Sequence, residues 1–551
     1  MKNFLQKIPS NNILMFSILT LIGCLCCIVT KYENFFDFAN YHYYNAFAFV
    51  QNRFNYDIVP NSVHAFFNPL PDLFLYYVIE FFNDDLILAY GLQGLWFGFL
   101  LFAFYKITTL FFDVKTLSGV IYSLLATVLA ATGQMTWFQT GTSTNEIMMA
   151  FWCLSGLYLL LYIIKYPQRQ SVVLFGIAGL ILGSALGLKQ TVFPICVAAG
   201  IGLITCYRHL NKPCIFICWF AFGGLLGFLL TDGWWMYKLY SLYGNPFFPF
   251  LNEFFGSPFF DNINYRDDRF IPPLKLAPFC PYLAMFSAYC NAETPFLEFR
   301  LPFFYTIGII IVTVFVCRPK KLKSFYIKNP ALFFLATFWI INYLLWMALF
   351  SILHYFVAGE MIIALFLIIL ISKYTPKSFF STIFYYTFVC ILLGSLMQTP
   401  YIYGSYGTRN GQSKMIDVEK IDLPDNTLIK LYNLPTAGVI PALTKGKNIK
   451  TLGYSQWFIE SGFGKIQPMK SSDFAERGKF REIRDEIAKN HKGTEILVFR
   501  LPNMPQLQQA FIQNMAPDLE GKACRELKTS FTPIFGQKFY ICLPPEINKQ
   551  Q

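Results

Sequence analysis

The sequence predicts a polytopic α-helical membrane protein with a small α/β domain at its C-terminal end. Of the 551 residues, 55% are hydrophobic and only 14% are charged, and the mean hydropathy is +0.44. Several near-continuous apolar runs reach the roughly 20 residues that an α-helix needs to cross a bilayer. After about residue 400 the charged fraction rises, and strand-like and helix-like patterns alternate. We therefore expect a membrane module over 1–400 and an extracytoplasmic α/β domain over 401–551.

The apolar runs predict about eleven membrane spans. They cover residues 12–30, 86–104, 117–132, 147–164, 171–187, 190–207, 213–231, 301–317, 331–350, 355–372 and 379–398. The stretch 71–82 is also apolar but too short to cross, so it predicts a helix that lies in the membrane interface.

Basic residues orient the predicted spans. Lys106 and Lys115 follow the second span, and the strongly basic segment 318–328 follows the eighth. Cytoplasmic loops carry an excess of Lys and Arg, so the N-terminus is expected inside, and an odd number of spans places the tail outside. The net charge of +12 is then explained by these loops and by anionic lipid, and no nucleic-acid partner is expected.

The outer side therefore receives nearly all of the polar sequence. It includes the loops 31–85, 133–146 and 232–300 together with the tail. The chain has no phosphate-binding P-loop and no dinucleotide-binding glycine fingerprint. An energy-rich substrate should consequently arrive already activated, and a lipid-linked form suits this location.

The first outer loop contains the main candidate for chemistry. Asp37 lies a few residues after the first span and is followed by Tyr41, His42 and Tyr44, while Asn68 opens a rigid turn into the interfacial helix. A carboxylate held at the membrane surface could act as a general base on a hydroxyl nucleophile, with the polar and aromatic residues contacting substrate. The alternative is an interfacial aromatic belt around a solvated aspartate.

Two shorter outer segments add an acid and a base. Asn145 and Glu146 open the fourth span, where Glu146 is either a helix-capping charge or a second carboxylate that faces Asp37. Lys189 lies in the outer turn between the fifth and sixth spans, against the positive-inside tendency. It is either a snorkelling lysine or a cation held for a phosphate.

Further charges come from the third outer loop and from the last outer hairpin. Arg266 and Arg269 flank two aspartates, and Arg300 begins the eighth span. These arginines either bind a phosphate in bidentate fashion or pair with their own acidic neighbours. His354 and Glu360 lie in the hairpin between the ninth and tenth spans, where they resemble a polar lid over a substrate cavity.

The tail alternates strand and helix patterns. We expect strands within 426–433, 448–454, 494–501 and 538–544, and helices within 473–490 and 505–515. Cys524 and Cys542 are its only cysteines, and in an oxidising compartment they predict a disulfide, with two unpaired core cysteines as the alternative. Most other cysteines lie in apolar runs, and no metal site is predicted from them.

This order of features resembles the GT-C superfamily of glycosyltransferases, which use polyprenyl-phosphate-linked sugars. The stretches DFANYHYYNAFAFVQNR, FNPLPDLFLYY, GTSTNE, GLKQT, GNPFFPFLN and HYFVAGE are similar to segments of bacterial GT-C-type membrane proteins, over roughly residues 10–400. Two departures are visible. His354–Tyr355 stands where the family usually has Arg or Lys with Tyr, and Asp37 stands alone where some members have an acidic pair.

The resemblance implies an inverting transfer of a sugar from a polyprenyl phosphate to a glycan or lipid acceptor hydroxyl. Asp37 would accept the proton of that hydroxyl, and Lys189 with one arginine of the third loop, or His354, would hold the donor phosphate. Glu146 would orient the acceptor or help to bind a divalent cation such as Mg or Mn, if one is used. The protein would lie in a bacterial inner membrane, with its N-terminus cytoplasmic and its C-terminal domain periplasmic.

Three other functions remain open at this point. A transporter of lipid-linked sugars would place its polar sites near the bilayer midplane, often in repeated halves. An O-antigen-type polymerase or ligase would use one long arginine-rich outer loop. A structural anchor would only display the tail. The sequence names neither the sugar nor the acceptor.

Overall fold

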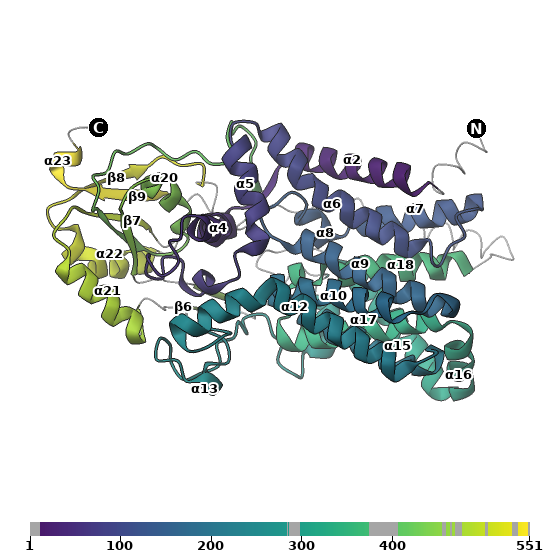
Figure 1. Cartoon of the computed structure of the whole chain (residues 1–551). Helices are drawn as coiled ribbons and strands as arrows, with labels where there is room; N and C mark the ends of the chain where they lie inside the picture. The colour runs from purple at the N-terminus through teal and green to yellow at the C-terminus, as the bar shows by residue number, and fades with distance from the viewer. Residues whose placement is uncertain are drawn as a thin grey trace.

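The computed structural model divides into a bundle of long helices and a mixed α/β region at one end of it (Figure 1). The structure describes residues 11–283, 285, 298–373, 406–454, 459–462, 465–468, 476–501, 505–531 and 538–548. The predicted span 379–398 lies outside the described residues.

Seven helices of the described chain are long and apolar enough to cross a membrane. They are α2 (Asn12–Thr30), α6 (Leu86–Thr108), α9 (Glu146–Lys165), α12 (Pro213–Tyr243), α15 (Arg300–Cys317), α17 (Pro330–Leu349) and Leu353–Lys373, which contains α18 (Val357–Lys373). Three shorter apolar helices accompany them: α7 (Leu117–Ala131), α10 (Val172–Leu188) and α11 (Phe193–Thr205). Every predicted span from 12–30 to 355–372 therefore coincides with an apolar helix.

Glycines allow neighbouring helices of the bundle to approach closely. Gly23 of α2 lies against Gly94 and Gly98 of α6, and Gly183 of α10 lies against Gly224 of α12, with no room for an added Cβ at Gly183. Lipid tails are as apolar as leucine, so helices in a membrane associate largely through such close packing. Small residues, and not an amphipathic stripe, therefore determine that α2 packs on α6 and α10 on α12.

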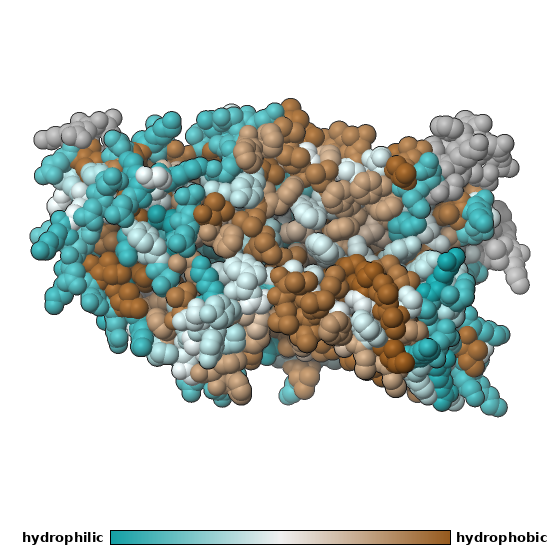
Figure 2. Space-filling view, in the orientation of Figure 1, coloured by the Kyte–Doolittle hydropathy of each residue, from teal (hydrophilic) through white to brown (hydrophobic). Residues whose placement is uncertain are grey.

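The surface of the molecule has an apolar middle and two polar ends. Figure 2 shows hydrophobic residues over the helical bundle and hydrophilic residues over the α/β region and over the opposite end. The helix α16 (Pro319–Lys328), with sequence PKKLKSFYIK, lies at that opposite end (Figure 1). Together with the apolar helices, this distribution indicates a membrane protein.

The first loop folds into a chain of short elements between α2 and α6. These are β1 (Tyr32–Asn34), α3 (Phe35–Asp37), the π-helix η1 (Phe38–His42), α4 (Tyr43–Val50), the 3₁₀ turns η2 (Ser62–Phe66) and η3 (Leu70–Asp72), and α5 (Leu73–Phe82). The helix α5 covers most of the predicted interfacial stretch 71–82. Tyr77 and Phe81 expose their rings from it, as expected for a helix that contacts the membrane interface.

Shorter helices complete the membrane module. The segments predicted to lie outside contain α8 (Gln134–Phe138), η5 (Gln190–Val192), α13 (Asn252–Phe255), η7 (Ala277–Phe279), α14 (Cys280–Leu283) and η9 (Leu353–Phe356). The turns between helices at the other end contain η4 (Pro167–Arg169) and η6 (Tyr207–His209).

The tail forms a five-stranded sheet with strand order β4-β3-β7-β9-β8. Its strands are β3 (Leu428–Tyr432), β4 (Lys450–Tyr454), β7 (Glu495–Arg500), β8 (Ala523–Leu527) and β9 (Phe539–Leu543). Strand β3 runs parallel to β4 and β7, whereas β9 runs antiparallel to β7 and β8. Its helices are η10 (Ala437–Val439), α20 (Ile440–Thr444), α21 (Gly478–Asn490), α22 (Pro505–Leu519) and α23 (Pro545–Asn548), and β5 (Ile459–Gly462) pairs with β6 (Lys465–Pro468).

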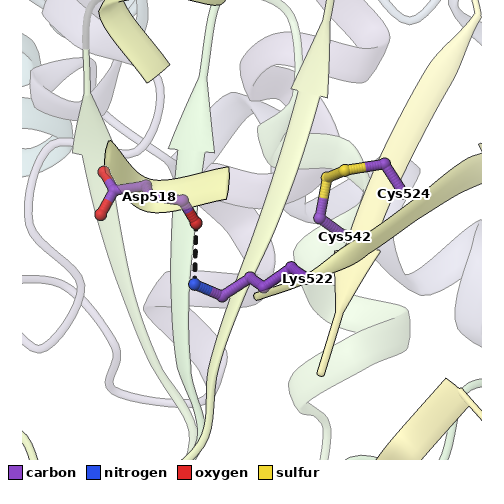
Figure 3. The surroundings of a disulfide bond; sticks show 4 residues. All are labelled: Asp518, Lys522, Cys524 and Cys542. Carbon is purple, nitrogen blue, oxygen red and sulfur yellow. Dashed lines mark hydrogen bonds between the residues drawn. A yellow bond between two sulfur atoms is a disulfide. The ribbon is translucent and has the colours of Figure 1, made fainter. Parts of the chain in front are cut away.

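A disulfide joins the two tail cysteines that the sequence predicted as a pair. Cys524 on the edge strand β8 lies directly opposite Cys542 on β9, with their Cα atoms 3.9 Å apart (Figure 3). Just before β8, Lys522 donates from Nζ to the carbonyl of Asp518 at 2.8 Å, which ties the end of α22 to the start of the edge strand. The edge of the sheet is thus fixed covalently.

The tail is joined to the first loop at several places, two of which extend its strands. Strand β1 pairs antiparallel with β2 (Tyr406–Thr408), and the buried Arg409 donates to Glu33 at 3.2 Å. At the second place, Ile58 donates to the carbonyl of Thr451 at 2.9 Å and accepts from the amide of Gly453 at 2.9 Å, so it extends the sheet beyond β4. These contacts hold the first loop between the bundle and the tail domain.

Candidate functional site

Charged side chains from five separate segments meet where the first loop covers the end of the bundle. Asp37 ends α3, and its carboxylate interacts electrostatically with His42 of η1, Glu146 of α9, Lys189 after α10 and Arg269 of the third loop. His354 of η9 interacts with Lys189, Arg269 and His42 as well. Asp37 thus lies within electrostatic range of cations from distant segments of the chain.

Asp37 is held by the residue that caps its own helix. Asn34 donates from Nδ2 to Asp37 Oδ2 at 2.7 Å, and its Oδ1 accepts from the amide of Asp37 at 3.2 Å. Burial raises the pKa of Asp37, and the charges of His42 and Lys189 oppose that increase. A carboxyl with a raised pKa is a better proton acceptor, which suits a general base.

Glu146 and Lys189 form an ion pair beside Asp37. Their Oε1 and Nζ atoms are 2.5 Å apart, and the Lys189 side chain is 18% exposed against 4% for Glu146. The Nε2 atom of His354 lies 3.8 Å from the same Oε1, and the ring centroid of Tyr355 lies 5.4 Å from Lys189 Nζ. An anionic ligand could therefore compete with Glu146 for the partly exposed ammonium.

Arg269 pairs with Asp267 of its own loop. Its Nε and Nη2 donate to the two carboxylate oxygens of Asp267 at 2.8 and 2.7 Å. Burial would raise the pKa of Asp267, but the hydrogen bonds and charge of Arg269 outweigh it, and the pKa is lowered. The alternative that the third-loop arginines pair with their own acidic neighbours is thus correct for Arg269. Arg269 also lies within electrostatic range of Asp37.

One ring nitrogen of the buried His42 has a hydrogen-bond partner, and the other has none among the described residues. Its Nδ1 lies 2.6 Å from Asp72 Oδ1, and the same oxygen accepts from Asn145 Nδ2 at 2.6 Å. The ring of Tyr41 lies 4.0 Å from that of His42 and 4.7 Å from that of His64, between centroids. Burial lowers the pKa of His64 to about 4, so this second histidine is neutral at physiological pH.

Asp72, which ends the turn that Asn68 opens, was not among the predicted site residues. Asp72 is 2% exposed. A carboxylate that directly precedes an apolar interfacial helix is the signal that could have identified it, because such a charge is costly unless it is paired.

Two predicted substrate contacts are structural instead. The hydroxyl of Tyr44 donates to Asp57 Oδ2 at 2.8 Å, away from Asp37, and that carboxylate also binds Arg53. Asn68 donates from Nδ2 to the carbonyls of Gly187 and Thr231 at 3.0 and 2.9 Å, which ties the first loop to α10 and α12. The hydroxyl of Tyr44 and the side-chain amide of Asn68 therefore hold the first loop in place.

Two predicted phosphate ligands cap helix ends instead. Arg266 donates to the carbonyl of Ala348 at the end of α17. Arg300 is buried and donates to the carbonyls of Leu129 and Thr132 at the end of α7, the first at 3.0 Å. Unpaired carbonyls at a helix C-terminus attract cations, so these arginines satisfy the ends of helices. Of the predicted cations, Lys189 and Arg269 lie within electrostatic range of Asp37, and His354 lies within range of Lys189 and Arg269.

Glu360 likewise caps a helix. It accepts from the amides of Met135 and Thr136 at the start of α8, at 3.1 and 2.8 Å, and from the hydroxyl of Thr136 at 2.6 Å. Its carboxylate therefore complements the N-terminal dipole of α8 and is not exposed to a substrate. No group of three or more metal-ligating side chains occurs within the residues that the structure describes.

Two small hollows lie against the first loop. One is formed by the first loop, α12 and α21 and includes Tyr44 and Trp235. The other is lined by Trp96, Gln139 and the segment 141–145, so Asn145 connects it to Asp72.

The chain matches no protein-family model, and neither the curated proteins nor the solved structures include a significant match to it. The resemblance to GT-C enzymes is consequently a hypothesis drawn from the residues and their arrangement.

Proposed function

We propose that this protein is an inverting membrane glycosyltransferase. It transfers a sugar from a polyprenyl-phosphate donor to a hydroxyl of a glycan or lipid acceptor. The observation that carries the proposal is the meeting of one proton-accepting carboxylate, Asp37, with Lys189 and Arg269 from distant segments, beside an apolar bundle. A base and a phosphate-binding cation, both next to lipid, are what this reaction needs.

The proposed reaction assigns a role to each group. Asp37 accepts the proton of the acceptor hydroxyl as the oxygen attacks the anomeric carbon. The phosphate takes the place of Glu146 at Lys189 Nζ, and Lys189 with Arg269 stabilises the charge on the leaving polyprenyl phosphate. Glu146, once released, accepts a hydrogen bond from the acceptor. His354 borders this phosphate position as a neutral donor.

The proposed location is the outer face of a bacterial inner membrane, with the N-terminus in the cytoplasm. The lysine-rich helix α16 lies at the end opposite the α/β domain (Figure 1), and basic segments mark the cytoplasmic side. The disulfide of the tail suits an oxidising compartment such as the periplasm.

The arrangement favours an enzyme over the other functions considered. The polar cluster lies at one end of the bundle, whereas transporters place such groups near the midplane. The tail also contributes to the fold around the site, because Arg409 binds Glu33 at the start of the loop that carries Asp37. An anchor for a displayed domain would not require that contact.

The proposal is tested with the purified full-length protein and a panel of radiolabelled polyprenyl-phosphate hexoses and pentoses. Bacterial glycolipids and glycans serve as acceptors, with and without Mg²⁺ or Mn²⁺. We expect transfer by the wild type and a decrease of at least about 100-fold in Asp37→Asn, because general-base catalysis contributes that much. Asp422→Asn, an exposed residue of the tail, is the matched control. Transfer by Asp37→Asn at the wild-type rate would overturn the assignment of the base.

A further inference from the structure

The pair His42–Asp72 has the geometry of an imidazole prepared to take up a proton. A carboxylate oxygen only accepts hydrogen bonds when ionised, so the 2.6 Å contact requires the proton of neutral His42 to be on Nδ1. Nε2 then presents a lone pair. That atom is buried and has no hydrogen-bond partner within the described chain, although His42 is only 1% exposed. A buried, unpaired imidazole nitrogen is costly and therefore calls for an explanation.

The backbone aligns this imidazole with Asp37. Residues 38–42 form a π-helix, which has i→i+5 hydrogen bonds, and Asp37 precedes it with helical backbone angles. The hydrogen bond of a π-helix joins residues i and i+5 and brings them near one face, whereas an α-helix of ~3.6 residues per turn places them on different faces. Asp37 and His42 accordingly lie within electrostatic range of each other, and no hydrogen bond joins Asp37 to Nε2 in the described chain.

We propose that His42 is a second proton carrier, which receives through Nε2 the proton that Asp37 takes from the acceptor. Asp72 is then a positioning residue: it fixes the Nδ1–H tautomer and stabilises the imidazolium. Asn145 holds Asp72 in turn. This inference rests on the proposed glycosyl transfer for its chemistry, but the tautomer and the coupling between Asp37 and His42 do not depend on it.

The proton balance of the step is complete. The O–H bond of the acceptor breaks as its oxygen forms a bond to the anomeric carbon, and the electron pair of the old C–O bond leaves with the phosphate. The proton moves to Asp37 and then, through one bridging water molecule, to His42 Nε2. The resulting imidazolium is paired with the Asp72 carboxylate, and Asp37 returns to its ionised form. Release of the proton from His42 to water after the products leave completes the cycle.

The other groups around His42 are consistent with this role. The titratable side chains that face it are Asp37, Tyr41, His64, Asp72 and His354. Burial keeps His64 neutral, with a pKa of about 4, so it adds no positive charge that would oppose an imidazolium. The Asp72 carboxylate, 2.6 Å from Nδ1, is placed to pair with an imidazolium at this position. The neighbourhood therefore stabilises the charged intermediate.

The tautomer is tested first, by ¹⁵N NMR of histidine-labelled full-length protein in lipid. The chain has only five histidines, so the signal of His42 is assigned by its loss in His42→Asn. We expect an Nδ1–H tautomer with an unprotonated Nε2. In Asp37→Asn the protonation midpoint of His42 should fall by at least about half a pH unit, because a nearby negative charge is lost. An Nε2–H tautomer, or an unchanged midpoint, would overturn the proposal.

The catalytic role is tested by kinetics of the same variants. The side-chain amide of His42→Asn can still donate to Asp72 and so preserves the fold, but it lacks the Nε2 base. We expect a kcat about 10- to 100-fold lower with KM within about twofold, and a rate that recovers as the pH is raised, since Asp37 must then release its proton to water. His209→Gln, at the far end of the bundle, serves as the control.

The outcomes separate this inference from the proposed function. Transfer by His42→Asn with the wild-type kcat and pH profile overturns the relay and leaves Asp37 as a base that acts alone. A loss of kcat that no pH restores, with a lowered thermal midpoint, also overturns it, since it shows a structural role. Absence of transfer by the wild type overturns the proposed function and the relay with it, whatever the NMR shows.

Discussion

The first loop holds two buried charged clusters that differ in how completely their hydrogen bonds are satisfied. In the first, Arg53 donates from Nε and Nη2 to Asp57 at 2.8 Å each and from Nη2 to the carbonyl of Ile449 at 2.6 Å. Asp57 also accepts from Tyr44 at 2.8 Å and from the amide of Thr451 at 2.9 Å. This cluster joins the loop to the tail.

The second cluster contains Asp37, His42, Glu146 and Lys189 and is less complete. Lys189 Nζ makes one hydrogen bond, to Glu146, in the described part of the chain, and His42 Nε2 makes none there. Both clusters are close to the same helix, α4, and both are rich in charge. The difference is that the first uses its polar atoms to hold the fold, whereas the second keeps some of them for a ligand or a proton.

This difference predicts opposite effects of mutation. Removing a member of a satisfied buried pair leaves an uncompensated charge and should destabilise the protein. Removing a charge that is desolvated without full compensation should cost little or even stabilise it, while abolishing function. The following predictions test that distinction, beginning with the largest expected effect on stability.

Asp57→Ala should lower the free energy of unfolding by about 3–5 kcal/mol. It leaves the guanidinium of Arg53 buried without its carboxylate and removes the acceptor for Tyr44 and Thr451. Limited proteolysis should cut the tail from the bundle faster, and the thermal midpoint should fall. Asp422→Ala, whose side chain is 97% exposed, should change neither property. An equal response of the two variants would show that the Arg53 cluster does not hold the tail.

Replacing both cysteines of the disulfide by serine should cost about 3 kcal/mol of tail stability. Removing the link lets the unfolded chain regain the entropy of a closed loop spanning 18 residues. Urea denaturation monitored by a tail fluorophore measures this cost. Because β8 is the edge of the sheet farthest from the β4 edge that Ile58 extends, the transfer rate should be unchanged below the new unfolding midpoint. A parallel loss of transfer would show that the tail acts on the site as one rigid unit.

Glu298 should make the stability of the wild type depend on pH. Burial raises its pKa to about 7, against the usual 4.5, although Arg300 opposes the shift. A raised pKa contributes stability that is complete below about pH 4.5 and is lost as the pH rises through 7. Glu298→Gln should therefore stabilise the protein by on the order of 2 kcal/mol above pH 7 and flatten this dependence. Thermal midpoints from pH 5 to 8 measure it, and an unchanged slope would contradict it.

The sequence predicts the bundle well because each span is an uninterrupted apolar run, and its alternation of strand and helix patterns locates the tail strands. Within the proposed site, it singled out Asp37 and Lys189 because both break an expectation: a lone carboxylate after a span, and a lysine in a turn predicted to be outside. It did not predict the helix-end contacts of Arg266, Arg300 and Glu360, since a charge at a helix end has the same sequence signature whether it caps a helix or binds a ligand. The pairing of His42 with Asp72 depends on the path of residues 51–72, which brings the end of η3 back against η1. No local sequence pattern predicts that path.

Asp37→Asn should give the smallest effect on stability, with the sign opposite to that of Asp57→Ala. Because burial raises the pKa of Asp37 above its value in the unfolded chain, the ionised carboxylate destabilises the fold as the pH rises through that raised pKa. The amide removes this charge and can still accept from Asn34, so the variant should unfold at an equal or higher temperature at pH 7, by up to about 1 kcal/mol. Thermal unfolding of the purified variant measures this, with Asp57→Asn as the matched substitution in the satisfied cluster. A clear loss of stability in Asp37→Asn would place Asp37 with the structural charges, and the contrast between the two clusters would then no longer identify the site.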